Sequence, residues 1–348
     1  MKAAVLYETG KPLVVEEGII IPDLQTGQVL VQIAYSGICR SQLMETRGKR
    51  GNDPYLPHLL GHEASGIVLE TGKDVSKVKK NDRVILTWMK GEGLDCGGAK
   101  FRKGDTIINA GGVTTFSNLT IACENRCIKL PDGVPMDLAP LLGCALPTGA
   151  GIVMNTIKPE KENSLAVFGC GGIGLSAIML ANVFECQTIV AVDIEDHKLD
   201  KAKELGATHT INSSHGNPVE KIQKITVGRG VDFSIEAAGR ASVIESAFMS
   251  VRDKGGLCVI AGHPANNERI QIDPFELIKG KQIQGSWGGE CQPEQDIPLL
   301  AKYYLEGKLP MEKLISHKYR LEEINEGLDA LETNSANRIL IQMDEINL

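Results

Sequence analysis

The sequence lacks any long hydrophobic run, and this absence excludes one class of protein. No apolar stretch in the 348 residues approaches the roughly 20 residues that a helix needs to span a bilayer. Residues 1–8 turn polar too soon for a secretory signal peptide, so we expect a cytoplasmic protein. No long block of basic residues occurs, and the formal net charge is −7. Nucleic acid and anionic membranes are therefore not expected as main partners.

Aromatic residues are also few, at 4% of the chain, so the composition gives no basis for inferring a large aromatic pocket. The nine cysteines are scattered through apolar surroundings, which favours free thiols or metal ligands over a disulfide framework. A chain of 348 residues exceeds what one compact core usually organises. We therefore expect two domains.

The clearest motif follows a short apolar run at residues 165–168. Residues 169–174 read Gly-Cys-Gly-Gly-Ile-Gly, and helical periodicity continues after them. Glycine at the first, third and sixth places allows a tight turn, close approach of a pyrophosphate and close packing of the helix. A second apolar run, at 188–192, ends in Asp193, an acid at the distance of about 20 residues that such sites use to bind a ribose. Together these features predict a dinucleotide site rather than an ordinary strand–helix turn.

The carboxylate of Asp193 also predicts which dinucleotide is bound. It can accept hydrogen bonds from two ribose hydroxyls, whereas a 2′-phosphate would place like charge against it. Ile194 follows, where an NADP site often carries an arginine. NAD is therefore favoured over NADP.

The pattern of strands and helices divides the chain into three parts. Residues 1–145 contain short β-type runs separated by glycine and proline, which predicts a small, irregular β-barrel. Residues 146–287 alternate strands with amphipathic helices, which predicts a doubly wound parallel sheet. Residues 288–348 are too few for a domain, and we expect them to return to the first part. The expected strands of the parallel sheet are 165–168, 188–192, 208–211, 231–235, 257–261 and 282–286.

Three places in the first part carry residues that can bind a metal, namely Cys39, His62 and Cys144. Two thiolates and one imidazole leave one tetrahedral position on zinc open, which is the arrangement of catalytic sites. Taken singly, each cysteine is more simply a buried packing residue and His62 a hydrogen-bonded structural histidine. The spacing alone does not show that the three converge.

With these motifs the chain resembles the zinc-dependent alcohol dehydrogenases of the medium-chain dehydrogenase/reductase superfamily. The similarity covers nearly the whole sequence and is carried by residues 37–41, 61–66, 142–144, 169–174, 315–317 and 323–327. It implies an α/β protein with a GroES-like catalytic barrel and a Rossmann domain that oxidises an alcohol to an aldehyde or ketone, reversibly, by hydride transfer to NAD. It also implies a homodimer or homotetramer, and we expect strands 257–261 and 282–286 as candidate sheet edges for pairing.

The resemblance also implies roles for individual residues. Cys39, His62 and Cys144 would hold the catalytic zinc, Glu63 would lie beside the metal or bind it transiently, and Ser41 would contact the substrate hydroxyl. Trp88 would line the substrate pocket, although a core or interface tryptophan is the simpler alternative. The residues implied at the cofactor are Arg40 and Arg338 at the pyrophosphate, Lys198 and Asp193 at the adenosine ribose, Thr148 and Ile173 at the nicotinamide, and Gly169, Gly171, Gly172 and Gly174 in the glycine turn. Arg40, Lys198 and Arg338 could instead be solvated surface charges.

Three departures from the family pattern stand out. Residues 89–100, which carry four cysteines in many members, contain Cys96 alone, so we expect one zinc per chain and no structural zinc. Gln42 stands where the family usually has an aspartate that orients the histidine ligand. Met44 replaces a proton-carrying histidine of some members, so the proton from Ser41 must leave by water or another group, and His58 is the nearest histidine along the chain before His62.

Two alternative functions remain open at this point. The first is a polyol, sugar or other specialised alcohol oxidoreductase on the same scaffold. The second is a zinc-binding or NAD-binding protein without turnover, which the substitutions at Gln42 and Met44 keep under consideration.

Overall fold

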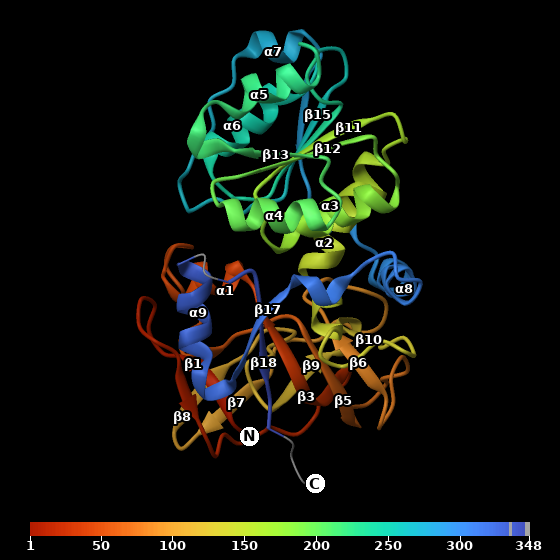
Figure 1. The fold of residues 1–348 in the computed structure, drawn as a ribbon. Coiled ribbons are helices and arrows are strands. Elements are labelled where there is room, and N and C mark those ends of the chain that lie inside the picture. Colours follow the sequence, from red (N-terminus) through yellow and green to blue (C-terminus); the bar gives the residue numbers. More distant parts are fainter. Residues whose placement is uncertain (334–335, 345–348) are drawn as a thin grey trace. The chain divides into compact units, whose positions relative to one another are not determined.

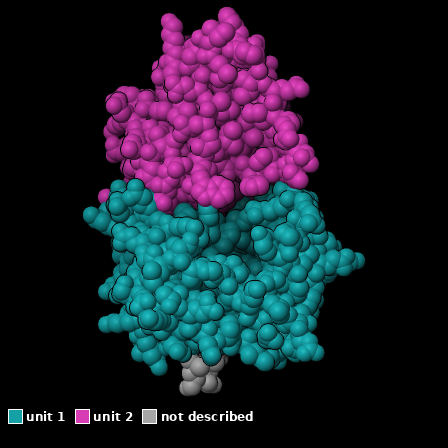
Figure 2. All heavy atoms as spheres, turned by 180° about the vertical axis from the view of Figure 1, so that it is seen from behind, with its two compact units in different colours: residues 1–144, 292–307, 311–348 teal, residues 145–291, 308–310 magenta. Residues whose placement is uncertain are grey.

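A computed structural model describes residues 1–333 and 336–344 (Figure 1). The chain forms two compact units, coloured separately in Figure 2. Unit 1 contains residues 1–144, 292–307 and 311–348, and unit 2 contains residues 145–291 and 308–310. Among the described residues, no helix is both long and apolar enough to cross a membrane.

Unit 1 is built mainly from two β-sheets. The first sheet has the strand order β2-β1-β4-β8-β7, and the second has the order β10-β6-β5-β3-β18-β17 with β9 also paired to β3. The strands are β1 (Ala3–Leu6), β2 (Val14–Glu16), β3 (Gln28–Ile38), β4 (His58–Leu59), β5 (Ala64–Thr71), β6 (Arg83–Leu86), β7 (Lys100–Lys103), β8 (Thr106–Asn109), β9 (Leu119–Cys123), β10 (Cys127–Lys129), β17 (Ile315–Arg320) and β18 (Arg338–Gln342). Frequent turns keep most of these strands short, as the glycine and proline distribution predicts.

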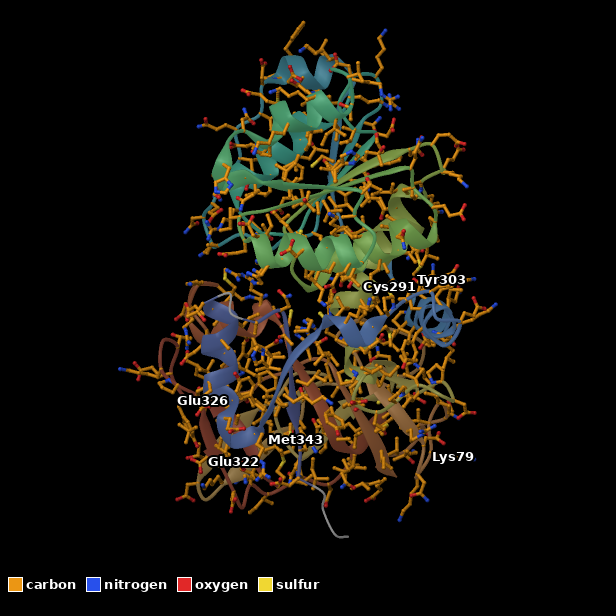
Figure 3. The ribbon with its side chains drawn as sticks, in the orientation of Figure 1. Lys79, Cys291, Tyr303, Glu322, Glu326 and Met343 are labelled. Carbon is orange, nitrogen blue, oxygen red and sulfur yellow. The ribbon has the colours of Figure 1, made fainter. Side chains whose placement is uncertain are left out.

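Few helices accompany these sheets. They are α1 (Arg40–Thr46), α8 (Pro293–Leu305) and α9 (Ile324–Glu332), with short 3₁₀ segments η1 (Glu124–Arg126), η2 (Ala139–Gly143), η6 (Met311–Leu314) and η7 (Leu321–Glu323). Helix α9 is amphipathic: Ile324 and Leu328 are buried in the core of unit 1, whereas Glu326 is exposed. Figure 3 marks Glu326 on this helix, Glu322 on η7 just before it, and the buried Met343 that follows β18.

The last part of the chain completes the second sheet of unit 1. Strand β18 pairs antiparallel with β3, with Ile339 opposite Ile38, and parallel with β17. Residues near position 340 therefore share a core with strands that the chain forms within its first 70 residues. This pairing places Arg338 beside the carboxyl end of β3, where the candidate site begins.

Unit 2 is a six-stranded parallel sheet with the order β13-β12-β11-β14-β15-β16. Its elements are α2 (Ala145–Gly151), the π-helical η3 (Ile152–Ile157), β11 (Ser164–Phe168), α3 (Gly172–Val183), β12 (Thr188–Asp193), α4 (Asp196–Glu204), β13 (His209–Asn212), η4 (Ser213–His215), α5 (Pro218–Ile225), β14 (Phe233–Glu236), α6 (Ala241–Ser250), β15 (Leu257–Ile260), α7 (Pro274–Ile278), β16 (Gln282–Gly285) and η5 (Gly288–Glu290). Numbered within the unit, this order is the 3-2-1-4-5-6 arrangement of a doubly wound dinucleotide-binding sheet. The predicted fold class is confirmed for this sheet.

The topology also locates the ligand crevice of unit 2. The chain winds from β11 to one side through β12 and β13 and then to the other side through β14, β15 and β16. Ligands of such sheets bind at the carboxyl ends of the strands where the direction reverses, which here is between β11 and β14. Strand β11 is buried along its whole length because it lies in the middle of the sheet with helices on both faces.

One expectation about the sheet edges is wrong. Strand β15 pairs with β14 on one side and with β16 on the other, so residues 257–261 are internal. Within the described sheet the edge strands are β13 and β16, and only the expected edge at residues 282–286 is one of them. The sequence pattern did not distinguish β15 from β16, because the order of parallel strands depends on the crossover helices rather than on the strands' own residues.

Candidate active site

Strand pairing brings Cys39 close to His62 and Glu63. Cys39 directly follows β3, and the two other residues directly precede β5. Strands β3 and β5 are antiparallel neighbours, and the Gly37 amide donates a hydrogen bond to the Glu63 carbonyl at 3.0 Å. The end of one strand and the start of the other therefore lie at the same place, although the residues are more than 20 positions apart.

Gly37 is required for this close approach. A Cβ atom at position 37 would lie 2.7 Å from the Cδ atom of the Glu63 carboxyl group. The absence of a side chain at Gly37 therefore leaves the space that the Glu63 carboxyl group occupies.

Cys144 reaches the same place from the other side of unit 1. It follows η2, whose last residue, Gly143, accepts a hydrogen bond from the Thr87 hydroxyl at 2.7 Å. A Cβ atom at Gly143 would lie 2.9 Å from Glu63 Cβ, so η2 packs directly on the Glu63 backbone and side chain. No local sequence signal marks this role of Thr87.

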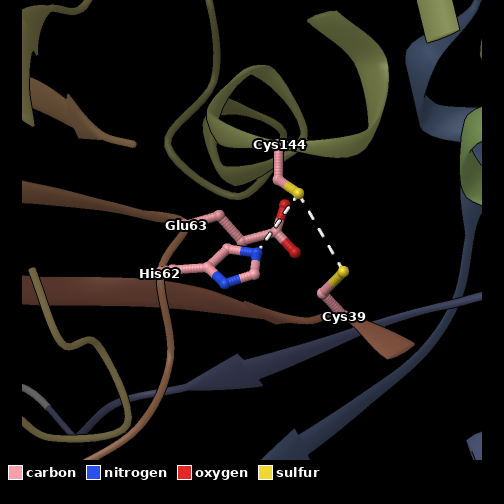
Figure 4. A group of neighbouring side chains, drawn as sticks. All are labelled: Cys39, His62, Glu63 and Cys144. Atoms are coloured by element: carbon pink, nitrogen blue, oxygen red, sulfur yellow. Dashed lines mark hydrogen bonds between the residues drawn. The ribbon is translucent and has the colours of Figure 1, made fainter. Parts of the chain in front are cut away.

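Cys39, His62, Glu63 and Cys144 form one group, in which the potential ligand atoms all lie within 4.8 Å of one another (Figure 4). His62 Nε2 is 3.2 Å from Cys144 Sγ, and the two sulfurs are 3.9 Å apart. A tetrahedral zinc ion with bonds of about 2.0–2.3 Å requires ligand atoms roughly 3.5 Å apart. The donor types and their separations therefore fit a zinc ion.

The protonation of the two thiols supports the same interpretation. A hydrogen bond from the Cys144 thiol lowers the pKa of Cys39 well below its ordinary value, and His62 and Arg338 act in the same direction. Donating that hydrogen bond and being buried raise the pKa of Cys144 well above its ordinary value. These surroundings favour the thiolate at Cys39, and binding of a divalent cation would favour loss of the proton from Cys144 as well.

Glu63 and Arg338 form a buried ion pair at the edge of this group. The exposed fractions of the two residues are 0% and 4%, and Arg338 Nη2 donates to Glu63 Oε2. Burial raises the pKa of Glu63 against the opposing attraction of Arg338. Within the described part of the chain, Glu63 Oε1 is buried without a hydrogen-bond partner. A buried carboxylate oxygen without a donor is suited to a cation.

Gln42 fixes the orientation of His62. Gln42 Oε1 accepts a hydrogen bond from the Cys39 amide at 2.9 Å, and Gln42 Nε2 lies against His62 Nδ1. The other ring nitrogen, Nε2, consequently faces the sulfur of Cys144. A neutral amide thus takes the place of the family's usual aspartate and makes contact with both a backbone amide and the imidazole.

The structure places the other predicted residues of unit 1 as follows. Ser41 Oγ, on α1, is buried and has no hydrogen-bond partner among the described residues. The rings of Trp88 and His62 have centroids 6.3 Å apart and are inclined by 58°. Arg40 begins α1 and is exposed. Met44 lies on the same helix.

His58 belongs to a second group that the structure brings together. His58 Nε2 is 2.8 Å from Asp53 Oδ2 and 3.9 Å from Glu45 Oε1. A cavity of about 330 Å³ is lined by His58, Glu45, Gln42 and His62 among others. His58 and His62, the histidine of the candidate metal site, therefore border the same cavity.

The glycine motif of unit 2 forms the turn between β11 and α3. A Cβ atom at Gly174 would overlap the carbonyl oxygen of Gly169, so only glycine permits this packing of helix against turn. Apart from its neighbours in the chain, no atom of the described residues lies within 4 Å of the Cβ position of Gly171, which precedes the first residue of α3, Gly172. The backbone amides at the start of this 12-residue helix, which no side chain caps, lie beside an open space and suit a phosphate group.

Asp193 lies at the end of β12, beside this turn. Its Oδ2 accepts a hydrogen bond from the Cys170 amide at 2.7 Å, and its Oδ1 accepts one from the Ile194 amide at 2.8 Å. The carboxylate is therefore held in place by the backbone of the glycine turn and of its own strand end. A fixed acid at this position is suited to bind the hydroxyls of a ribose.

The remaining residues predicted at the cofactor divide between the units. Lys198 is buried on α4, Thr148 is buried on α2, and Ile173 lies in the first turn of α3, all in unit 2. A Cβ atom at Gly149 would overlap the carbonyl of Ile173, so α2 and α3 pack closely at this point. Arg338, in contrast, belongs to unit 1.

Comparisons with known proteins agree with this geometry. Residues 25–132 match the family model described as alcohol dehydrogenase GroES-like domain, and residues 172–303 match the model described as zinc-binding dehydrogenase. The chain is 31% identical to an alcohol dehydrogenase of Malus domestica over 99% of this chain and 97% of that protein. It is 31% identical to the class-P alcohol dehydrogenase of Arabidopsis thaliana over 98% of this chain and 97% of that protein.

Solved structures of alcohol dehydrogenases are also similar to this chain. The benzyl alcohol dehydrogenase of Acinetobacter calcoaceticus superimposes with a TM-score of 0.88 at 30% identity, covering 99% of both chains. An alcohol dehydrogenase zinc-binding domain protein of Burkholderia ambifaria superimposes with a TM-score of 0.90 at 29% identity, also covering 99% of both chains.

A GroES-like unit and a dinucleotide-binding unit, matched over nearly their whole length, define a medium-chain dehydrogenase/reductase. Within that superfamily the chain belongs to the zinc-dependent alcohol dehydrogenase family, whose members are oxidoreductases acting on alcohols.

Proposed function

We propose that this protein oxidises an alcohol to an aldehyde or ketone, reversibly, with one catalytic zinc ion per chain and NAD as hydride acceptor. The observation that carries the proposal is the group of Cys39, His62, Glu63 and Cys144, whose ligand atoms lie within 4.8 Å of one another. In this proposal two thiolates and one imidazole hold the metal, and one position stays open for the substrate oxygen.

The bound zinc would supply Lewis acidity, which lowers the pKa of a bound hydroxyl group, and bound NAD would accept the hydride. The chain's own residues would position the reactants and handle the proton. Ser41 Oγ is buried and makes no hydrogen bond to the described residues, so it is available to accept a hydrogen bond from the substrate hydroxyl. Met44 cannot take the proton onward, so the proton would leave Ser41 through water or another group.

Glu63 would act beside the metal rather than as a permanent ligand. Its Oε2 is bound by Arg338, whereas its Oε1 has no hydrogen-bond partner among the described residues. A carboxylate tied at one oxygen could approach the metal with the other oxygen when substrate or product exchanges. Trp88, close to the His62 ring, would form part of the substrate pocket.

For the cofactor, we propose that Gly169, Gly171, Gly172 and Gly174 cradle the pyrophosphate and that Asp193 and Lys198 bind the adenosine ribose. Arg40 and Arg338 would contact the pyrophosphate, and Thr148 and Ile173 the nicotinamide. The carboxylate of Asp193, fixed by hydrogen bonds from the backbone, is the feature that favours NAD over NADP.

We further propose that the chain binds no structural zinc, because Cys96 is the single cysteine of residues 89–100. A homodimer or homotetramer is proposed, with the edge strand β16 as a place for pairing between subunits. We also propose a cytoplasmic location. The substrate is proposed to be a small-molecule alcohol or, in the reverse direction, an aldehyde or ketone.

The test combines metal analysis with a substrate panel. We expect about one zinc per chain, and NADH formation with some primary, secondary or vicinal-diol substrates at mildly alkaline pH, where release of a proton favours oxidation. Cys144→Ala is expected to lose zinc and turnover while it still binds NADH. Cys186→Ala is the matched control, because both cysteines have an exposed fraction of 6% and Cys186 lies in unit 2.

Two results would overturn the proposal. Stoichiometric zinc and full turnover in Cys144→Ala would show that the metal lies elsewhere. Zinc-loaded protein that is silent toward every alcohol, aldehyde and ketone in the panel would favour a zinc- and NAD-binding protein without turnover. Activity confined to polyols or sugars would assign the protein to the more specialised oxidoreductases.

A further inference from the structure

Two cysteines outside the candidate metal site lie in direct contact. Cys96, in the segment 89–100, has its sulfur 2.8 Å from the sulfur of Cys123, at the end of β9. Both are free thiols, and this separation is within about 1 Å of a disulfide bond length. The contact joins residues that are 27 positions apart in the sequence.

The backbone around Cys96 is already arranged about the sulfur of Cys123. The Cys96 amide donates to Cys123 Sγ at 3.3 Å, and the Cys123 thiol donates to the Cys96 carbonyl at 2.8 Å. Further hydrogen bonds hold the segment to η1, since the Leu94 amide donates to Glu124 Oε2 at 2.8 Å and the Gly91 amide donates to the Asn125 carbonyl at 2.9 Å. Joining the two sulfurs therefore needs little movement of the chain.

A metal site does not account for this contact. Cys127 is buried near Cys123, but among the described residues these cysteines do not form a group of three ligand atoms within 4.8 Å of one another. A thiol pair without a third ligand cannot close a structural zinc site, which takes four. Two thiols without further ligands can instead form a disulfide with each other.

Exposure assigns different roles to the two thiols. Cys96 is partly exposed, so a reagent in solution can reach it, whereas Cys123 has an exposed fraction of only 1%. Cys96 is therefore the thiol that a disulfide in solution reaches first, and Cys123 is the thiol that can attack Cys96 from within the chain.

We propose that Cys96 and Cys123 form a reversible disulfide that ties the segment 89–100 to β9. The segment corresponds to the lobe that in many members of the family is held together by a cysteine-bound zinc ion. Here a disulfide between two cysteines would hold the segment in place. This inference goes beyond the proposed function and does not depend on it, because the bond forms without zinc, NAD or turnover.

The oxidant is a small-molecule disulfide such as oxidised glutathione. The Cys96 thiolate attacks one sulfur of that disulfide, its S–S bond breaks, and one small thiolate leaves. The Cys123 thiolate then attacks the Cys96 sulfur of the mixed disulfide and expels the second small thiolate. The two protons lost by the protein thiols go to the two leaving thiolates, and two electrons pass from the protein to the small disulfide.

The pH dependence of the reaction follows from the surroundings of Cys96. Burial and the hydrogen bond with Cys123 raise the pKa of Cys96 to about 12. The attacking thiolate is therefore scarce at neutral pH, and each rise in pH increases its amount until the pKa is reached. We expect the disulfide to form slowly at neutral pH and several-fold faster at mildly alkaline pH.

The test uses the zinc-loaded chain of 348 residues, reduced and then incubated with oxidised glutathione at neutral and mildly alkaline pH. Intact mass and peptide mapping locate every bond formed. We expect a loss of two hydrogen masses, a peptide that joins Cys96 to Cys123, and a melting temperature raised by a few degrees that returns on reduction. Cys96→Ser should show neither the joined peptide nor the shift, whereas Cys291→Ser, at another partly exposed cysteine, should show both.

The mapping decides the outcome even if a variant folds poorly, because the joined peptide is measured in the unmodified chain. Glutathione retained on Cys96, without any Cys96–Cys123 peptide, would overturn the proposal. The same holds if the cross-link joins other cysteines or if both thiols remain free after prolonged alkaline oxidation. A zinc ion bound per chain beyond the first and lost in Cys96→Ser would overturn it as well, and would leave the proposed catalytic function untouched.

Discussion

Replacing Asp193 by asparagine is expected to weaken the discrimination against NADPH, because the change removes a charge and keeps the size of the side chain. Asp193 accepts hydrogen bonds from the Cys170 amide at 2.7 Å and from the Ile194 amide at 2.8 Å. The carboxylate is thereby fixed at the turn that carries the glycine motif. It cannot easily rotate away from a 2′-phosphate that takes the place of a ribose hydroxyl.

Coulomb's law gives the size of the effect. Two unit charges about 4 Å apart repel by about 1 kcal/mol in bulk water and by about 4 kcal/mol at an effective dielectric constant near 20. Asp193 is half-buried, so the value for this site falls between these limits. The ratio of NADPH to NADH dissociation constants should therefore fall by between about five-fold and about a thousand-fold in Asp193→Asn.

The substitution also has a structural effect that acts on both dinucleotides. An asparagine has one acceptor oxygen, so its amino group must face either the Cys170 amide or the Ile194 amide, donor against donor. An unsatisfied donor of this kind costs about 1–3 kcal/mol. Because this cost weakens NADH and NADPH binding alike, the ratio of the two affinities isolates the effect of the charge.

Calorimetric titration with NADH and NADPH at low and high salt measures that ratio without any need for the substrate. The control is Asp200→Asn, which removes a charge from an exposed position on α4 and should leave the ratio unchanged. In the unmodified chain the ratio should shrink as salt is added, because salt screens charge repulsion. Equal affinity for NADH and NADPH in the unmodified chain, or an unchanged ratio in Asp193→Asn, would refute the reasoning.

Two further predictions concern unit 2. Gly174→Ala should lower the free energy of unfolding by about 1–3 kcal/mol and also lower NADH affinity, because its methyl group overlaps the Gly169 carbonyl. Gly171→Ala should lower NADH affinity alone, because its Cβ position is open. Urea unfolding measures the stability of each variant, and calorimetry measures its NADH affinity. Burial raises the pKa of Glu236 from 4.5 to about 7, so the folded state favours the protonated acid. The free energy of unfolding should fall by about 3 kcal/mol as pH rises from below 4.5 through about 7. Glu236→Gln should lack this fall, and parallel pH profiles of the two proteins would contradict the assignment.

The sequence predicted the architecture of unit 2 well, because each step depended on neighbouring residues. The apolar runs at 165–168 and 188–192 became β11 and β12, and the glycine turn and Asp193 lie where the motif places them. The strand expected at 231–235 instead runs over Phe233–Glu236, since its ends are set by pairing with β11 and β15. Strand order was harder to predict, and β15 was wrongly assigned to an edge.

For the proposed metal ligands, the sequence provided the residue types but not their convergence. Cys39 and Cys144 are separated by 105 positions, and the contact between them depends on the packing of η2 against the strands that carry the other ligands. Thr87, which fixes that packing through its hydrogen bond to the Gly143 carbonyl, belongs to no motif. The same limit applies to Cys96, the single cysteine of residues 89–100, which lies against Cys123, because nothing local to either residue indicates the other.

The pairing of Glu63 with Arg338 shows why the last segment belongs to the site. The two residues are 275 positions apart, and the pairing of β18 with β3 brings them together. Removing Arg338 would leave a buried carboxylate without its partner, a change that typically costs about 3–5 kcal/mol. The proposed contact of Arg338 with the cofactor and its observed contact with Glu63 require one guanidinium group to donate hydrogen bonds to two different anions. Arg338 Nε has no hydrogen-bond partner among the described residues, so this side chain can keep Glu63 in place and still have a donor left for an anion.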